Sequence, residues 1–189
     1  MESKTKFLGH PVHPMLIVFP LGLLVTSVVF DVIYLATNDP TFATASYWMI
    51  AAGVIGGVLA AIFGLIDWLN IPAGTRAKAV GLWHGLGNVA VLALFAVSWY
   101  VRRDNPTYVP STEAFVISLV AVGLGTVTAW LGGELVDRLG VGVDPGAHLD
   151  APSSLSGQPA GANLTAAGHA AARPETTGEQ PLREREVGR

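Results

Sequence analysis

Four long apolar segments constrain the fold of this chain more than any other feature of its sequence. Residues 14–30 contain no charged side chain, and three further apolar segments follow, separated by short polar loops. A helix needs roughly 20 apolar residues to cross the hydrocarbon core of a bilayer. The pattern therefore predicts an all-α, four-helix transmembrane bundle in up-down-up-down order. Its helices are expected near residues 14–35, 47–69, 80–101 and 112–139.

The composition agrees with a membrane protein and excludes several functional classes. Only 13% of the residues are charged, whereas a soluble domain carries about a quarter. The net charge of −3 disfavours nucleic acid as a partner. The absence of cysteine excludes disulfides, thiolate zinc sites and cysteine-bound iron–sulfur clusters. The sequence also contains no P-loop or dinucleotide-binding fingerprint, so we do not expect a stand-alone enzyme.

Basic residues set the expected orientation, because cytoplasmic loops of membrane proteins carry an excess of Lys and Arg. One end of the predicted bundle carries Lys4, Lys6, Arg76, Lys78 and Arg138. The other end carries only Arg102 and Arg103. This difference predicts that both termini lie in the cytoplasm.

The composition changes near Val143, where residues typical of unstructured chains replace the apolar segments. We therefore expect a transmembrane domain over residues 1–142 and a disordered polar tail over residues 143–189. His148 and His169 lie in this tail and are expected to have no fixed role.

Ionisable side chains gather at one end of the predicted bundle. In an up-down bundle, the start of the first and third helices meets the end of the second and fourth. Each predicted hairpin opens with a histidine and closes with an acid, a plan that a duplication would produce. Ionisable groups at membrane depth are costly and are functional candidates. The residues brought together are His10, His13, Asp67, His84 and Glu134.

Three interpretations of this cluster remain open. In the first, His13 or His84 donates a hydrogen bond to Asp67 or Glu134 and so fixes the bundle. In the second, the histidines bind haem or a metal ion. In the third, the ionisable groups form part of a proton or ion path.

The second interpretation assigns particular roles. His13 and His84 would be the axial ligands of one haem b, with His10 as an alternative ligand. Hydrogen-bonding partners would orient the ligands; the candidates are Asp67, Glu134 and Asn88. A non-haem transition metal would instead use His10, His13, Asp67, His84 and Glu134.

Two further features concern helix packing. Asp31 lies near the opposite end of the bundle and is expected to pair with Arg102 or Arg103. Small residues at four-residue spacing let helices approach closely, although a flat macrocycle would also need such space. These residues are Gly53, Gly57, Ala61, Gly81, Gly85, Ala121, Gly125, Ala129 and Gly133.

Several sequence motifs together resemble one bacterial family of integral membrane proteins, domain of unknown function 2231. They are the segments 9–20, 64–67 and 130–136 and the pair His84 and Asn88. The resemblance covers roughly residues 7 to 143 and implies a four-helix domain of the bacterial inner (plasma) membrane. The family is distantly similar to two-haem transmembrane cytochromes b, and some relatives stand beside Rieske iron–sulfur domains. Both similarities imply redox chemistry. Because two-haem cytochromes place histidine pairs near both membrane faces, this chain would bind at most one haem.

The sequence thus favours a membrane redox module that binds one haem b or a metal near the cytoplasmic face. A structural or assembly subunit without a cofactor and a proton or ion conductor are the alternatives. The expected partners are the lipid bilayer and an iron–sulfur redox protein, and a homo-oligomer remains an open alternative.

Overall fold

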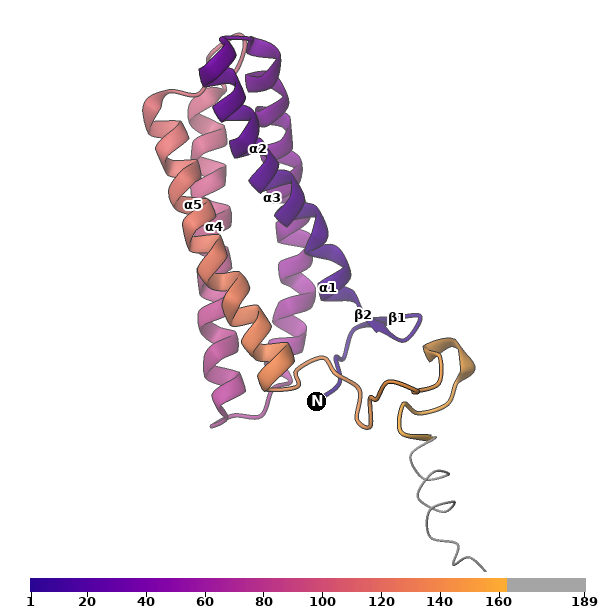
Figure 1. The fold of residues 1–189 in the computed structure, drawn as a ribbon. Coiled ribbons are helices and arrows are strands. Elements are labelled where there is room, and N and C mark those ends of the chain that lie inside the picture. The colour runs from indigo at the N-terminus through magenta and orange to yellow at the C-terminus, as the bar shows by residue number, and fades with distance from the viewer. Residues whose placement is uncertain (163–189) are drawn as a thin grey trace, which may run out of the picture. The chain divides into compact units, whose positions relative to one another are not determined.

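The computed structural model describes residues 1–162 and divides the chain into two units. The first unit, Met1–Pro145, holds four long helices that run up, down, up and down (Figure 1). Each is long and apolar enough to cross a membrane; the spans are Val12–Thr37, Pro40–Leu69, Arg76–Arg102 and Thr112–Arg138. The predicted all-α, four-helix fold is therefore confirmed.

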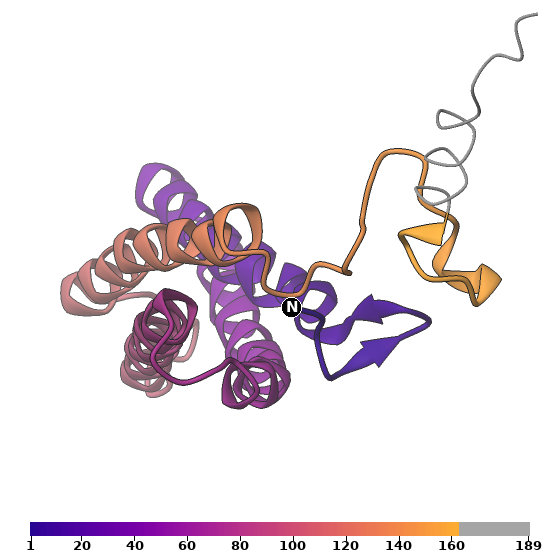
Figure 2. The same ribbon diagram turned by 90° about the horizontal axis from the view of Figure 1, so that it is seen from below.

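The elements of the first unit follow one another with short connections. They are β1 (Lys6–Phe7), β2 (His10–Pro11), α1 (Val12–Leu16), α2 (Val18–Thr37), α3 (Pro40–Leu69), α4 (Arg76–Arg102), α5 (Thr112–Gly133) and the π-helix η1 (Glu134–Arg138). Figure 2 views the bundle from the end that carries the α3–α4 loop and the end of α5. The β1–β2 hairpin lies beside this end of the helices in both views.

Capping residues explain where two helices begin. α3 begins at Pro40 rather than near Tyr47, because the Asp39 side chain accepts a hydrogen bond from the Thr41 N–H. Proline is favoured at the first helical position, where no backbone donor is needed. The Thr75 side chain caps α4 in the same way, so that helix also begins earlier than the apolar pattern alone predicts.

The first membrane span is interrupted between α1 and α2 at Ile17. Pro20 lies one turn further on and has no N–H to donate to the carbonyl of Leu16. The missing hydrogen bond accompanies this short break, which separates the His13 turn from the long helix that follows.

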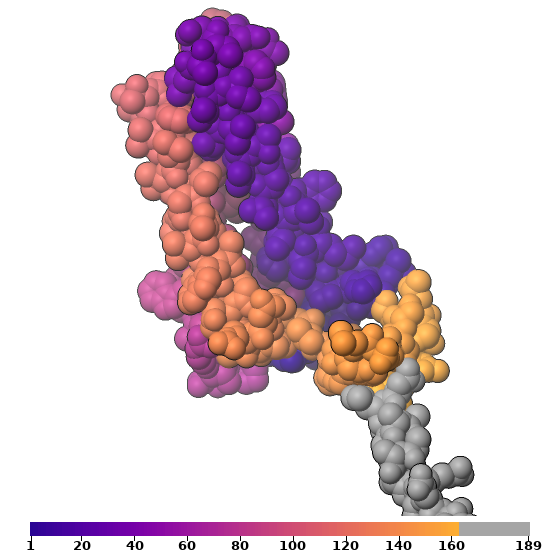
Figure 3. Space-filling view, in the orientation of Figure 1, coloured from indigo at the N-terminus to yellow at the C-terminus, as the bar shows by residue number. Residues whose placement is uncertain are grey.

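The centre of the bundle is a small apolar cluster, and most other large apolar side chains face outward. The cluster consists of Leu24, Val28, Ile50, Val91, Phe95 and Ala121. Outward-facing residues include Val25, Val29, Val120 and Trp130 on α2 and α5, the helices that stand at the surface in Figure 3. Such an apolar exterior is suited to lipid rather than to water, so the bilayer is the natural environment of this unit.

Close helix contacts explain part of the small-residue pattern. A Cβ atom added at Gly57 would lie 2.4 Å from Leu92, and one added at Gly53 would lie 2.7 Å from Leu24. Nothing lies within 4 Å of a Cβ added at Gly85. Gly53 and Gly57 therefore serve helix packing, whereas Gly85 leaves open space.

The second unit is described over residues 146–162 only. This segment forms turns and a single 3-10 helix, Ser154–Ser156, which the Ser153 side chain caps. His148 Nδ1 accepts a hydrogen bond from the Asp150 N–H. His169 and the rest of the predicted tail beyond residue 162 lie outside the described residues.

Candidate functional site

Two histidines from different hairpins lie close together at the end of the bundle that carries the α3–α4 loop. The ring centroids of His13 and His84 are 6.5 Å apart, and the ring planes cross at 87°. His13 Nδ1 lies 2.8 Å from the carbonyl oxygen of Ala60, and His84 Nδ1 lies 2.9 Å from that of Thr128. Because a carbonyl oxygen only accepts, each Nδ1 must carry the proton. Each Nε2 then carries a lone pair that can bind a metal.

A glycine makes room for each imidazole. A Cβ atom added at Gly64 would lie 2.9 Å from Cε1 of His13, and one added at Gly132 would lie 3.1 Å from Cε1 of His84. Each glycine stands one helical turn after the residue whose carbonyl binds that histidine. The two rings are thus held in the same way, against α3 in one hairpin and against α5 in the other.

Asn88 completes the surroundings of His84. Its Nδ2 atom donates to the His84 carbonyl at 2.9 Å and lies 3.2 Å from His84 Nε2. The Thr128 hydroxyl donates to Asn88 Oδ1 at 3.0 Å. The expected position of Asn88 beside the histidine is therefore observed, and a hydrogen bond across helices fixes its amide.

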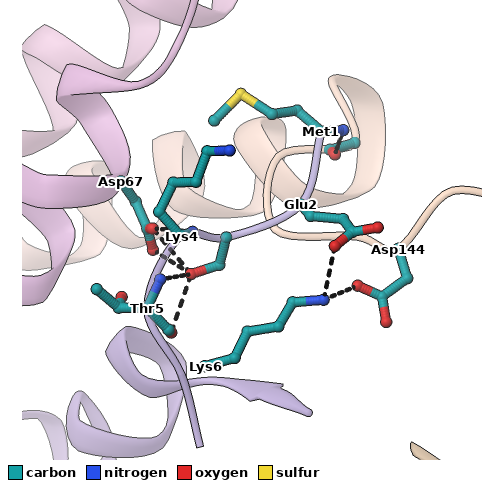
Figure 4. A network of polar contacts seen from close by, with 9 residues as sticks. Met1, Glu2, Lys4, Thr5, Lys6, Asp67 and Asp144 are labelled. Carbon is teal, nitrogen blue, oxygen red and sulfur yellow. Dashed lines mark hydrogen bonds and ion pairs between the residues drawn. The ribbon is translucent and has the colours of Figure 1, made fainter. Parts of the chain in front are cut away.

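The two carboxylates expected near the histidines have other partners. Asp67 accepts hydrogen bonds from Ser3 Oγ at 2.8 Å and from the Lys4 N–H at 2.9 Å (Figure 4). Glu134 accepts one from Arg76 at 2.6 Å. The His–carboxylate pairing expected from the sequence is therefore replaced by pairing of each histidine with a backbone carbonyl.

The proposed five-residue metal site is not assembled either. His10 lies on the exposed β2 strand. Within residues 1–162, no three histidine, aspartate or glutamate side chains are grouped in a way that could hold a metal ion. The arrangement that the structure does provide is a pair of imidazoles.

Further contacts hold the N-terminal segment against the bundle. Lys6 pairs with Glu2 at 3.1 Å and also with Asp144, beyond the end of η1 (Figure 4). The hydrogen bond to Asp144 raises the pKa of the Lys6 ammonium above its usual value. Ser3 is 6% exposed and contacts both carboxylate oxygens of Asp67. Asp67 thus anchors the segment that precedes α1.

We expect the Asp67→Ala variant to release this segment while the four helices stay folded. A hydrogen bond to a charged group contributes about 1.5–3 kcal/mol, so opening of residues 1–11 should become easier by an amount of that order. Hydrogen exchange of residues 1–11, followed by mass spectrometry, measures the change. Asp137→Ala, at an exposed carboxylate of η1, is the control. Unchanged exchange in the Asp67 variant would contradict the anchoring role.

A second polar layer lies at the opposite end of the bundle. The Arg102 guanidinium donates to both carboxylate oxygens of Asp31, each at 2.7 Å, and both side chains are fully buried. The predicted pairing of Asp31 is confirmed, with Arg102 as the partner. Three buried serines add hydrogen bonds to the guanidinium that the sequence analysis missed: Ser46, Ser98 and Ser118. Ser98 could have been identified from the sequence, because it lies one helical turn before Arg102 on the same face of α4.

An apolar layer lies between these two polar ends on α2 and α4. Leu24 and Val28 lie between the His13 end and Asp31, while Val91 and Phe95 lie between His84 and Arg102. These core positions carry no group that can relay a proton.

Aromatic rings pack the loop before α5 onto the bundle near the ion pair. Tyr47 stacks on Tyr108 with centroids 4.0 Å apart and on Trp99 with centroids 5.3 Å apart. Tyr47 and Trp99 directly follow Ser46 and Ser98, which bind the Arg102 guanidinium. The stack thus covers the end of the bundle where the charged pair is buried.

Comparison with known proteins identifies a family. A family described as "Predicted membrane protein (DUF2231)" matches residues 9–145, a range that includes both histidines, all four spans and the buried ion pair. No curated protein and no solved structure matches the chain.

Proposed function

We propose that this chain, which belongs to the DUF2231 family of predicted membrane proteins, is a membrane redox module in which His13 and His84 hold one haem b. The observation that carries the proposal is the matched presentation of the two imidazoles. Each has its Nδ1 proton bound to a backbone carbonyl, which leaves Nε2 as the nitrogen with the lone pair; at His84 this atom lies 3.2 Å from the Asn88 amide, which would give way to a metal. When bound, haem supplies one-electron transfer.

The number of protein ligands favours haem over a non-haem metal. Zinc sites take three or four ligands from the protein, and the described residues offer two nitrogen donors without a nearby carboxylate. Haem supplies four nitrogen ligands of its own, so the two histidine nitrogens of His13 and His84 would be enough to hold it.

The separation of the rings fits ligands that share one metal atom. A metal–nitrogen bond is about 2 Å long, so two imidazoles that would hold one metal atom through Nε2 must lie close together. The centroids of His13 and His84 are 6.5 Å apart. The chain thus presents the two rings at a suitable distance.

The surrounding residues act on the ligands through the backbone. A hydrogen bond from Nδ1–H to a carbonyl fixes the tautomer and the ring orientation, and makes Nε2 a stronger donor to a metal. The carbonyls of Ala60 and Thr128 have this role. It is the role that the sequence analysis assigned to Asp67 and Glu134, and it avoids burying a carboxylate beside the site.

The distribution of basic residues supports a cytoplasmic position for the histidine end, with the bacterial inner membrane as the location. Arg102 is buried in its ion pair and does not belong to a loop. Among the described residues, this leaves Arg103 as the exposed basic side chain at the opposite end. The histidine end carries Lys4, Lys6, Arg76, Lys78 and Arg138. By the positive-inside rule, a redox partner such as an iron–sulfur protein would approach the histidines from the cytoplasm.

Titration of the full chain with ferric haem in mild detergent tests the proposal. We expect saturation at one haem per chain and the spectrum of a low-spin iron with two imidazole ligands. Non-saturable uptake would overturn the proposal. So would a purified protein that holds stoichiometric zinc or copper and excludes haem.

The glycine beside His13 gives a further prediction. In Gly64→Ala, the new methyl group would meet the imidazole at 2.9 Å, so the ring must turn away from Ala60. We expect haem affinity to fall about 10–100-fold, as it does when an orienting hydrogen bond is lost. Gly85→Ala is the matched control, since its methyl group meets nothing within 4 Å. Equal affinities of the two variants, measured by haem titration, would contradict this account.

A further inference from the structure

We infer that the two hairpins are copies of one structural unit, and that the Asp31–Arg102 pair makes each hairpin pair with the other rather than with a second copy of itself. The first hairpin comprises residues 12–69 (α1 to α3), and the second comprises residues 76–138 (α4 to η1). The inference concerns how the bundle assembles and is independent of the proposed cofactor.

The first helices of the two hairpins (α1–α2 and α4) carry polar residues at matching positions, two of them identical. His13, Ser27 and Asp31 stand in the first hairpin. Each has a counterpart 71 positions later, the same separation that the ion pair spans; the counterparts are His84, Ser98 and Arg102.

The second helices of the two hairpins, α3 and α5, hold the histidines through matching residues. In α3, Ala60 accepts the histidine hydrogen bond and Gly64 lies against the ring. In α5, Thr128 and Gly132 do the same at the same four-residue spacing. The repeat therefore extends to the contacts within each hairpin.

Counterparts meet one another across the interface between the hairpins. His13 faces His84 with ring centroids 6.5 Å apart, and Asp31 binds Arg102 at 2.7 Å. Leu24 and its counterpart Phe95 belong to the same apolar cluster. Contact between equivalent residues is the mark of a twofold interface, so the hairpins pack about an approximate twofold axis.

A twofold interface is self-complementary, so a hairpin with this surface could also pair with its own copy in another chain. The ion pair breaks that symmetry. Pairing of two first hairpins would bury Asp31 against Asp31, and pairing of two second hairpins would bury Arg102 against Arg102. Buried like charges strongly disfavour such pairings. A buried ion pair often contributes little stability compared with apolar residues. We therefore assign the Asp31–Arg102 pair to the choice of hairpin partner rather than to stability.

A single cysteine can report incorrect pairing, because the natural chain contains none. In Leu24→Cys, the thiol lies near Phe95 when the hairpins pair correctly. When two first hairpins from different chains pair, Cys replaces Leu at both facing positions and a disulfide can link the chains. The full-length variant is treated in membranes with a permeant oxidant, which accepts the two electrons and two protons released as the S–S bond forms.

The reporter is compared in three backgrounds: the natural pair, the swapped pair (Asp31→Arg with Arg102→Asp) and an apolar pair (Asp31→Leu with Arg102→Leu). We expect linked dimers to increase several-fold with the apolar pair and to remain at the natural level with the swapped pair. The neutral pair Asp31→Asn with Arg102→Gln replaces the apolar pair if that variant does not accumulate, and should also increase linkage. An apolar or neutral pair with no more linked dimer than the natural pair would overturn the inference, as would a swapped pair that links as strongly as the apolar one.

Discussion

The His84→Ala variant is expected to lose the low-spin haem spectrum completely while the bundle remains folded. His84 supplies one of the two nitrogen donors, and Asn88 cannot replace it because an amide nitrogen has no lone pair for iron. The loss should exceed the about 10–100-fold effect that removal of an orienting partner causes. The visible spectrum and the haem content per chain measure it, and the far-ultraviolet circular dichroism checks the helices.

The matching variant His13→Ala should have the same effect, because both imidazoles are held by equivalent contacts. His10→Ala is the control, since His10 lies on exposed β2 outside the pair. We expect it to bind haem as the natural chain does. If His84→Ala keeps the natural spectrum and stoichiometry, or if His10→Ala alone abolishes binding, the assignment of the ligands is wrong.

The Arg102→Met variant is expected to destabilise the bundle by about 3–5 kcal/mol, the usual effect of removing one partner of a buried pair. Asp31 would be left without its bidentate partner, and Ser46, Ser98 and Ser118 would lose the guanidinium. The free energy of unfolding in mixed micelles, followed by circular dichroism, measures the effect.

Two comparisons make this prediction specific to the buried charge. Arg103→Met, at the neighbouring and partly exposed arginine, should change stability by less than about 0.5 kcal/mol. The double variant Asp31→Leu with Arg102→Met should recover most of the lost stability, because no charge remains buried. Equal stabilities of the Arg102 and Arg103 single variants would show that the pair does not stabilise the fold.

Those features of the fold that depend on local sequence could be predicted. Charge-free segments of membrane-spanning length determine the four helices, and alternating direction brings His13 and His84 to one end. A buried carboxylate such as Asp31 requires a cationic partner, and the sequence places Arg102 at the same depth of the bundle. The start of α3 at Pro40 was missed because the apolar pattern was given more weight than the capping signal of Asp39.

The partners of the polar groups could not be predicted in the same way. Ala60 and Thr128 bind the histidines through main-chain carbonyls, which every residue carries and no side-chain pattern marks. Asp67 could equally have bound a histidine. Its choice of Ser3 depends on how the N-terminal segment folds back on the bundle, which is a tertiary feature.

The central claim, that His13 and His84 hold one haem between the two hairpins, is tested most directly on protein purified from cells supplied with haem and metals. Its visible spectrum is recorded oxidised and dithionite-reduced, and iron per chain is measured on the same sample. The account predicts one iron per chain, a Soret band and a sharp reduced α-band of b-type haem. A featureless spectrum without stoichiometric iron would contradict it and leave the two imidazoles with a structural role in packing the hairpins.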